Sequence, residues 1–390
     1  MGVWMRLTAL CAVAGTGLAV VSGAAGWDTA HRVLAAIALP PIAALVAAAW
    51  ISARRLLVPS LVALVLFGLA ALLTGRAVHL AFAALALAAC AWTAAFTFRS
   101  PVAAGPWRDY VTLTKPRIMS LLLLTGAAGF FVGAGRFSSL GVFGLTMLGL
   151  ALACGGASAL NHYLDRDIDR LMGSRTERRP VASGRVPPAA ALEFGLALSA
   201  FSFVLLDALV NFPTALLALG GNLFYVVVYT RWLKRSTAQN IVIGGAAGAV
   251  PPLVGFAGAS GNFGWAAVFM FVIVFVWTPP HFWALALMIK EHYAKAGVPM
   301  LPVTRGDRET ARQILWYTVV LVAVTLAPVA FGTFGVVYGL SALVLGFGFL
   351  WLAVELRRTM ARAAAVRLFH FSLLYLALLF VAMAIDTVVI

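Results

Sequence analysis

The chain has 390 residues, of which 63% are hydrophobic and 11% are charged, and its mean hydropathy is +1.00. A soluble domain cannot bury so large a share of apolar side chains, so these values exclude an ordinary soluble globular protein. The formal net charge of +15 is also found in nucleic-acid-binding proteins. Here, however, the Lys and Arg residues lie in short segments between long apolar runs, which indicates topology signals in a membrane protein.

The apolar runs are continuous and about 20 residues long, which is typical of membrane-spanning helices. Four spans are predicted before residue 100, over 7–25, 33–52, 57–74 and 77–97. A polar linker covers 101–117, and nine further spans are predicted over 118–135, 139–160, 188–206, 210–229, 240–259, 264–288, 313–332, 335–355 and 368–388. The expected fold is therefore all-α and polytopic, with a four-helix extension (1–100) before a nine-helix domain (118–390).

Basic residues gather on alternate connections between these spans. The rich connections are 54–55, 99–117, 166–185, 231–235, 290–312 and 357–367, whereas the opposite connections hold little beyond Arg32, Arg76 and Arg136. The positive-inside rule then places the N-terminus and all the rich connections in the cytoplasm. We expect a multi-pass protein of the cell inner membrane whose two long loops, 161–187 and 289–312, face the cytoplasm.

The first long loop carries oxygen ligands at a helical interval. Asn161, Asp165 and Asp169 lie four residues apart, so a helix would stack them on one face. Like charges at this spacing repel unless a cation lies between them, and hard oxygen ligands suit Mg²⁺. Asp167 is expected to point away and to pair with a neighbouring Arg. The alternative is a solvated loop of internal salt bridges, but acidic residues are costly at the end of a span.

Basic groups surround this predicted metal site, as binding of a diphosphate requires. Arg178 and Arg179 are predicted to act with the acidic residues in catalysis. In the second long loop, Glu291 is a candidate for a second metal or for the far side of the diphosphate. The remaining candidate substrate-binding residues on the cytoplasmic side are Lys115, Arg117, Arg175, Lys234, Arg235, Asn240, Lys290 and Tyr293.

The run from Asn161 to Arg170 resembles the N-x-x-x-D-x-x-x-D motif of the UbiA superfamily of intramembrane prenyltransferases. The finer resemblance is to the protohaem IX farnesyltransferases and covers about residues 107–390. It rests on these stretches: Asp109 to Arg117, Arg175 to Pro180, Asn240 to Gly245, Pro251-Pro252, Trp277 to Trp283, and Ala296 to Pro302. The chain departs from that family at His292, where the family has Asp, so Glu291 is the one acidic residue of that loop before Asp307.

The resemblance implies a nine-helix bundle around a lipid-open cavity. It also implies transfer of farnesyl from farnesyl diphosphate to a vinyl group of haem b, with Mg²⁺, to give haem O. Three roles are open for His281: a haem-side ligand, a proton carrier or a hydrogen-bonded core histidine. Two alternative functions are prenylation of a quinone or chlorin precursor by another UbiA-type enzyme, and a haem carrier or redox subunit of the membrane.

The extension contains two histidines that begin parallel spans. His31 begins the second span and His79 the fourth, so both are expected at the outer face. Facing histidines in a four-helix bundle can ligate a haem iron axially, whereas the alternative is a pair of interfacial side chains that reach the headgroups. The surrounding residues also resemble half of haem A synthase, which implies a haem b cofactor in the extension and haem A synthase as a partner.

Overall fold

The computed structural model describes residues 107–135 and 139–389, together with 12, 13, 16, 42, 46 and 61–66. Within these residues nine helices are long and apolar enough to cross a membrane. They are α6 (Pro116–Ala134), α7 (Leu140–Leu164), α9 (Pro188–Leu209), α10 (Phe212–Leu223) with its continuation to Ser236, α12 (Asn240–Ser260), α13 (Trp265–Met288), α16 (Gly306–Ala330), α17 (Val336–Thr359) and α18 (Arg362–Val389). The nine predicted spans of this domain are confirmed. The four spans predicted before residue 100 lie almost wholly outside the described residues, as do His31 and His79.

The two long loops are partly helical, which the sequence pattern did not predict. The first contains α8 (Arg166–Leu171) and a 3₁₀ turn, η2 (Gly173–Arg175); the second contains α14 (Lys290–Lys295) and α15 (Leu301–Thr304). The second loop is also shorter than expected, because α16 begins at Gly306 rather than near residue 313. The first turns of α16 are polar and precede the apolar span. Asp307 and Glu309 lie in the first turn, where their negative charge complements the positive end of the helix dipole.

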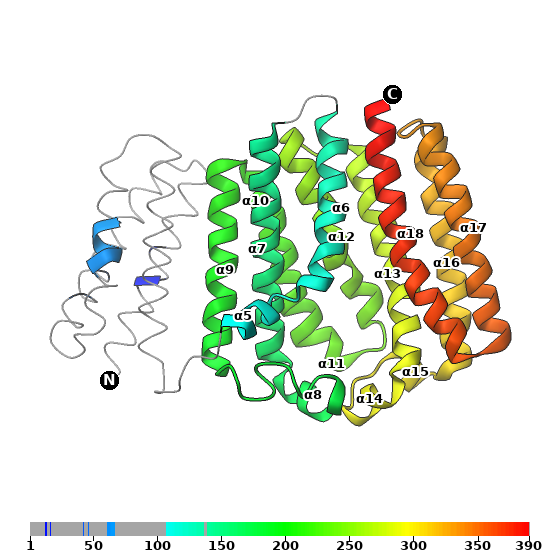
Figure 1. The fold of residues 1–390 in the computed structure, drawn as a ribbon, viewed down its shortest axis with the longest axis horizontal. Helices are drawn as coiled ribbons and strands as arrows, with labels where there is room; N and C mark the ends of the chain where they lie inside the picture. Colours follow the sequence, from blue (N-terminus) through cyan, green and yellow to red (C-terminus); the bar gives the residue numbers. More distant parts are fainter. Residues whose placement is uncertain are drawn as a thin grey trace.

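The helices form a closed bundle whose loop helices share one end (Figure 1). Each long helix packs against its sequence neighbours, and α18 contacts both α13 and α6, which closes the ring. The helices α8, α14 and α15 lie at the end opposite the C-terminus, as expected if both long loops face one side of the membrane. A short helix, α5 (Trp107–Leu113), leads into α6 at that same end.

Helices α6 and α12 meet backbone to backbone. A Cβ atom built on Gly255 of α12 would lie 1.8 Å from the carbonyl oxygen of Gly126, and one on Gly129 of α6 would lie 2.2 Å from the carbonyl oxygen of Pro252. Apolar side chains gain little from associating in lipid, so spanning helices rely on such close approach of small residues. These glycines therefore set the distance between two walls of the bundle.

We expect Gly255→Ala to destabilise the bundle by about 1–3 kcal/mol, because the added methyl group must push α6 and α12 apart. Gly144→Ala is the matched control, since nothing lies within 4 Å of a Cβ at this exposed position of α7. The measurement is the thermal midpoint of the purified protein in one detergent. Equal midpoints for the two variants would contradict the packing argument.

Candidate active site

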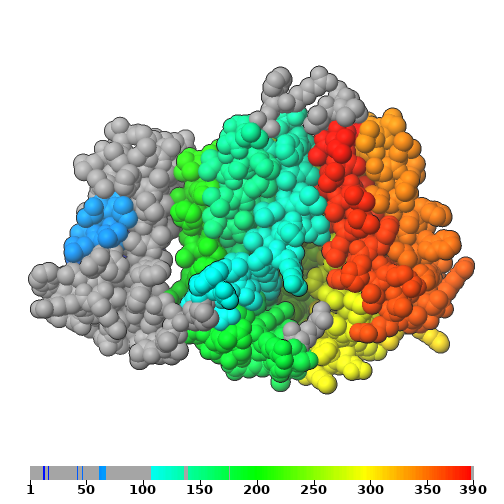
Figure 2. Space-filling view, in the orientation of Figure 1, coloured from blue at the N-terminus to red at the C-terminus, as the bar shows by residue number. Residues whose placement is uncertain are grey.

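An apolar cavity of about 450 Å³ lies between the helices. Its wall is drawn from α6, α7, α10, α12, α13 and α18, and Figure 2 shows the surface hollowed between α6 and α18. Most lining side chains are hydrophobic or aromatic. The polar lining residues include Lys115, Arg117, Ser158, Asn222, Tyr225, Tyr229, Thr278 and His281. A cavity of this size and composition suits a largely apolar ligand with one polar end.

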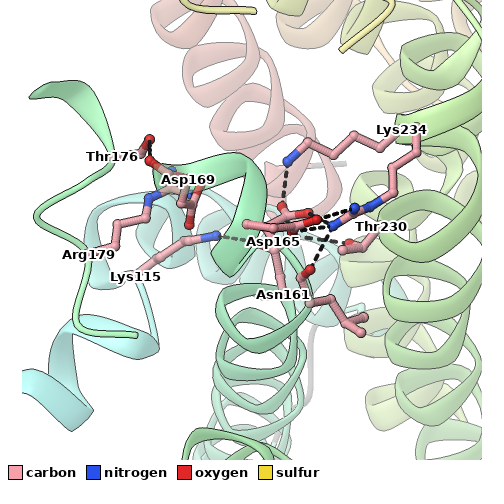
Figure 3. A network of polar contacts seen from close by, with 11 residues as sticks. Lys115, Asn161, Asp165, Asp169, Thr176, Arg179, Thr230 and Lys234 are labelled. Atoms are coloured by element: carbon pink, nitrogen blue, oxygen red, sulfur yellow. Dashed lines mark hydrogen bonds and ion pairs between the residues drawn. The ribbon is translucent and has the colours of Figure 1, made fainter. Parts of the chain in front are cut away.

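A polar cluster lies at the end of α7, beside the cavity (Figure 3). Asn161 donates from Nδ2 to Asp165 Oδ2 at 2.8 Å and accepts at Oδ1 from Lys115 Nζ, also at 2.8 Å. Lys234, which begins α11 (Lys234–Ser236), forms an ion pair with the fully buried Asp165. Because Lys115 contacts Asn161 and also lines the cavity, the cluster and the cavity form one site.

A second ion pair lies one turn further along the chain. Arg179 NH1 contacts Asp169 Oδ1 at 2.7 Å, and the hydroxyl of Thr176 donates to the backbone carbonyl of Asp169. Burial, together with the charge of Asp165, raises the pKa of Asp169, although Arg179 opposes this shift. One oxygen of each acid, Asp165 Oδ1 and Asp169 Oδ2, is buried without a hydrogen-bond partner. These two oxygens are candidate ligands for a cation.

The acidic motif keeps its four-residue interval although α7 ends at Leu164. The backbone N–H groups of Asp165 and Asp169 donate to the carbonyls of Asn161 and Asp165, so the helical spacing continues into α8. Asp167 is 58% exposed and forms two hydrogen bonds of 2.7 Å with Arg235, which lower its pKa. The expectation that Asp167 points away and pairs with an arginine is confirmed.

Several predicted residues lie apart from this cluster. Glu291 is exposed. Among the described residues, no three His, Cys, Asp or Glu side chains form a group that could hold a metal ion, so Glu291 does not complete such a group with Asp165 and Asp169. Arg178 is exposed, and its carbonyl accepts a bond from Arg185. The side chain of Arg175 lies outside the described parts. Lys290 pairs with Asp307, whereas Tyr293 and Asn240 are buried.

The departure at His292 has a structural role. Its Nδ1 lies 2.7 Å from the carbonyl oxygen of Met172, which can only accept, so the imidazole donates. This bond joins α14 to the end of α8. The two long loops are therefore held together by the His292 side chain. An ionised Asp, the residue of the resembled family at this position, could not donate this hydrogen bond.

The sequence pattern missed three contributors to the site. Thr230 accepts a bond of 3.1 Å from Asn161 Nδ2, and Tyr225 and Tyr229 line the cavity. All three lie on η3 (Phe224–Leu233), a π-helical stretch that continues α10. Such stretches are frequent at functional sites, but no residue pattern predicts a π-helical stretch. The four-residue interval between the two tyrosines was the one available signal for a shared face.

Residues 122–382 match the model of the UbiA prenyltransferase family. The chain belongs to this family. A protoheme IX farnesyltransferase of Symbiobacterium thermophilum is 54% identical over 281 residues, which cover 72% of this chain and 94% of that protein. The protoheme IX farnesyltransferase of Gloeobacter violaceus is 53% identical and is covered to 92%.

One further relative aligns beyond the bundle. The protoheme IX farnesyltransferase of Chloroflexus aurantiacus is 45% identical over 349 residues, which cover 86% of this chain and 59% of that protein. Residues 107–390 make up a smaller share of the chain than this aligned 86%, so the alignment also includes residues of the N-terminal hundred.

Solved structures share the fold at low sequence identity. A digeranylgeranylglyceryl phosphate synthase has a TM-score of 0.61 and 18% identity, with 73% of this chain and 99% of that chain covered. A UbiA homolog from Archaeoglobus fulgidus bound to GPP and Mg²⁺ has a TM-score of 0.55 and 19% identity, covering 70% of this chain and 99% of that chain. The intramembrane prenyltransferase fold expected from the sequence is confirmed.

The cluster geometry separates the three aspartates by role. Asp165→Asn and Asp169→Asn should abolish prenyl transfer, because each removes a buried carboxylate beside the cavity. Asp167→Asn should have a much smaller effect, since the Asp167 side chain is exposed and pairs with Arg235. The measurement is transfer activity in membranes at matched protein levels. Equal losses in all three variants would contradict the assignment.

Proposed function

We propose that this chain transfers the farnesyl group of farnesyl diphosphate to a vinyl group of haem b and so makes haem O. The observation that carries the proposal is the junction of two environments at Lys115, which contacts the charged cluster and also lines the apolar cavity. A prenyl diphosphate has the same two parts, a charged head and an apolar tail. The names of the relatives from Symbiobacterium and Gloeobacter support haem b as the acceptor.

The charged cluster would hold the diphosphate. Lys115, Lys234 and Arg179 now bond to Asn161, Asp165 and Asp169, respectively, and can turn their N–H groups to phosphate oxygens. Asp165 and Asp169 would hold Mg²⁺ through Oδ1 and Oδ2, respectively, the oxygens that have no hydrogen bond, which fits an ion that keeps several waters and binds few protein groups. When bound, this ion supplies positive charge that stabilises diphosphate as it leaves. A UbiA homolog from Archaeoglobus fulgidus was solved with GPP and Mg²⁺ bound, which supports a metal-dependent prenyl diphosphate site in this fold.

The cavity would hold the farnesyl tail and the acceptor away from water. As the bond between the allylic carbon and the diphosphate oxygen breaks, the vinyl group of haem b supplies the electron pair for the new carbon–carbon bond. Water then adds to the resulting cation and loses a proton, which leaves a hydroxyl group. Aromatic lining residues such as Tyr225, Trp277 and Phe369 exclude bulk water until then. The active-site loops and the N-terminus would face the cytoplasm of the inner membrane.

The decisive experiment is incubation of the purified full chain with haem b, farnesyl diphosphate and Mg²⁺, followed by mass analysis of the extracted haem. We expect a mass increase equal to one farnesyl group plus one hydroxyl group, and we expect chelation of Mg²⁺ to abolish the product. Unmodified haem under conditions that turn over a related prenyltransferase would contradict haem as the acceptor. A prenylated quinone precursor in a parallel assay would then support the alternative UbiA-type activity.

The two adjacent arginines should differ in their effect on diphosphate binding. Arg179→Ala should raise the KM for farnesyl diphosphate about 10- to 150-fold, because one charge-assisted bond contributes about 1.5–3 kcal/mol. Arg178→Ala should raise it less, since the Arg178 side chain is exposed and Arg179 lies against Asp169. Steady-state kinetics with each substrate varied in turn give both values. A larger effect on the KM for haem would assign these residues to the haem propionates instead.

The N-terminal extension is a separate proposal. If His31 and His79 ligate a second haem b, the purified protein should show a low-spin haem spectrum without added substrate. His31→Ala and His79→Ala should each lose this signal, with Asp165→Ala present throughout to prevent turnover. Identical haem content in all variants would instead favour interfacial side chains. Retention of haem by the extension would also support a role in delivering haem O to haem A synthase.

A further inference from the structure

His281 is held in a fixed orientation in the cavity wall. Its ring stacks between Trp277, at a centroid distance of 4.3 Å and an angle of 15°, and Phe369, at 4.8 Å and 21°. Trp277 and His281 lie on α13 and Phe369 lies on α18, so two helices clamp the ring. The Trp277 indole also donates to the backbone carbonyl of Ser372 at 2.9 Å. The plane of the imidazole is therefore set by packing.

The hydrogen bonds of Ser372 determine which ring nitrogen carries the proton. The Ser372 hydroxyl donates its single proton to the carbonyl of Phe369 at 2.6 Å. Its oxygen lies 2.6 Å from His281 Nδ1 and must therefore accept from it. Nδ1 is the protonated nitrogen, and Nε2 keeps its lone pair. Nε2 has no hydrogen-bond partner among the described residues, and it is not one of the fully buried unsatisfied atoms, so it is open to a ligand in the cavity.

This arrangement is what a metal-ligating histidine requires. Such histidines almost always donate their second ring N–H to a fixed acceptor, which sets the tautomer and the orientation of the ring. Most buried side-chain polar atoms have a hydrogen-bond partner, so a ligand in the cavity would complete the bonding of Nε2. Among the described residues, no acidic side chain bonds to this ring to stabilise a charged imidazolium. The neutral ring thus presents a lone pair to an apolar cavity, and an imidazole nitrogen is a common ligand of haem iron.

The depth of His281 also fits the reaction. The residue lies eight positions before Ile289 at the loop end of α13, which corresponds to about 12 Å along the helix. Lys115 and Arg117, at the loop end of α6, line the same cavity. A porphyrin held at His281 would therefore share the cavity with the basic residues of its loop end.

We infer that His281 ligates the iron of the acceptor haem through Nε2 and that Ser372 positions the ring by accepting from Nδ1. The inference rests on the proposed function only for the identity of the acceptor. According to this inference, the site selects a haem by binding its iron, and not only by contacting the substituents of the porphyrin. Ser372 is a positioning residue, because it acts on the iron only through the imidazole.

The test is a titration of the purified full chain with haem b in the absence of farnesyl diphosphate. His31→Ala and His79→Ala are present in every sample, so that haem in the extension does not contribute. His281→Phe keeps an aromatic ring between Trp277 and Phe369 but removes both nitrogens. Ser372→Ala removes the acceptor. His370→Ala is the matched control, because this neighbouring histidine is exposed and bonds to the carbonyl of Val366.

We expect His281→Phe to lose the histidine-ligated absorption and resonance Raman signatures and to weaken haem binding at least about tenfold. Ser372→Ala should keep the ligand but shift the iron–nitrogen stretching frequency, and it should weaken binding by about 10- to 100-fold, as loss of such supporting bonds does elsewhere. His370→Ala should match the parent. Added imidazole should restore a nitrogen-ligated spectrum to His281→Phe.

Unchanged spectra and affinity in His281→Phe would overturn the inference, and so would a loss of turnover without a spectral change, which would assign the residue to proton transfer. If His281→Phe does not fold, the iron–nitrogen frequency of Ser372→Ala decides, since an unshifted band excludes Ser372 as the support of the ligand. The product assay on the parent protein separates the two proposals. If the parent protein makes haem O but His281→Phe leaves the haem spectrum unchanged, only the ligation by His281 is refuted. If the parent protein shows a histidine-ligated spectrum but makes no haem O, only the proposed function is refuted.

Discussion

The ion pair between Lys234 and Asp165 is the interaction on which the site depends. It joins the end of α7 to the end of the π-helical stretch η3, and it is almost entirely removed from solvent. A buried charge without its partner costs roughly 3–5 kcal/mol, so each residue is tolerated there because of the other. The pair keeps a cation and a carboxylate beside an apolar cavity, where neither would be stable alone.

The neighbouring interactions form a cluster whose internal ion pairs can be exchanged for contacts with a charged substrate. Asn161 links Lys115 to Asp165, and Arg179 holds Asp169. A diphosphate accompanied by a divalent cation carries the same two signs of charge as the cluster. Substrate binding can therefore replace these internal pairs with pairs of similar kind, which limits the cost of desolvating a highly charged head group next to a membrane.

Four helices serve the apolar part of the chemistry. Helices α13 and α18 hold His281 against two aromatic rings, and close contact of α6 with α12 through Gly129 and Gly255 sets another part of the cavity wall. Both features depend on shape rather than on charge. The cavity is consequently rigid where an acceptor would be oriented, and its charged groups lie at the loop end, where a leaving group can reach water.

The sequence alone determined the helical class, the nine spans of the bundle, the placement of both long loops at one end of the bundle, and the family. Each of these follows from hydropathy, charge distribution or a local motif, which are properties of short segments. The four-residue interval of Asn161, Asp165 and Asp169 likewise predicted their proximity. The tertiary structure decided which cation meets which carboxylate. Lys234 is the nearest cation to Asp165, with Arg235 3.9 Å from its Oδ1, and Thr230 supports Asn161 from a π-helix. Ser372 sets the tautomer of His281 across 91 residues. Such pairings depend on how distant helices pack, and packing in lipid is set by small residues and buried polar contacts that have no periodic signature in the sequence.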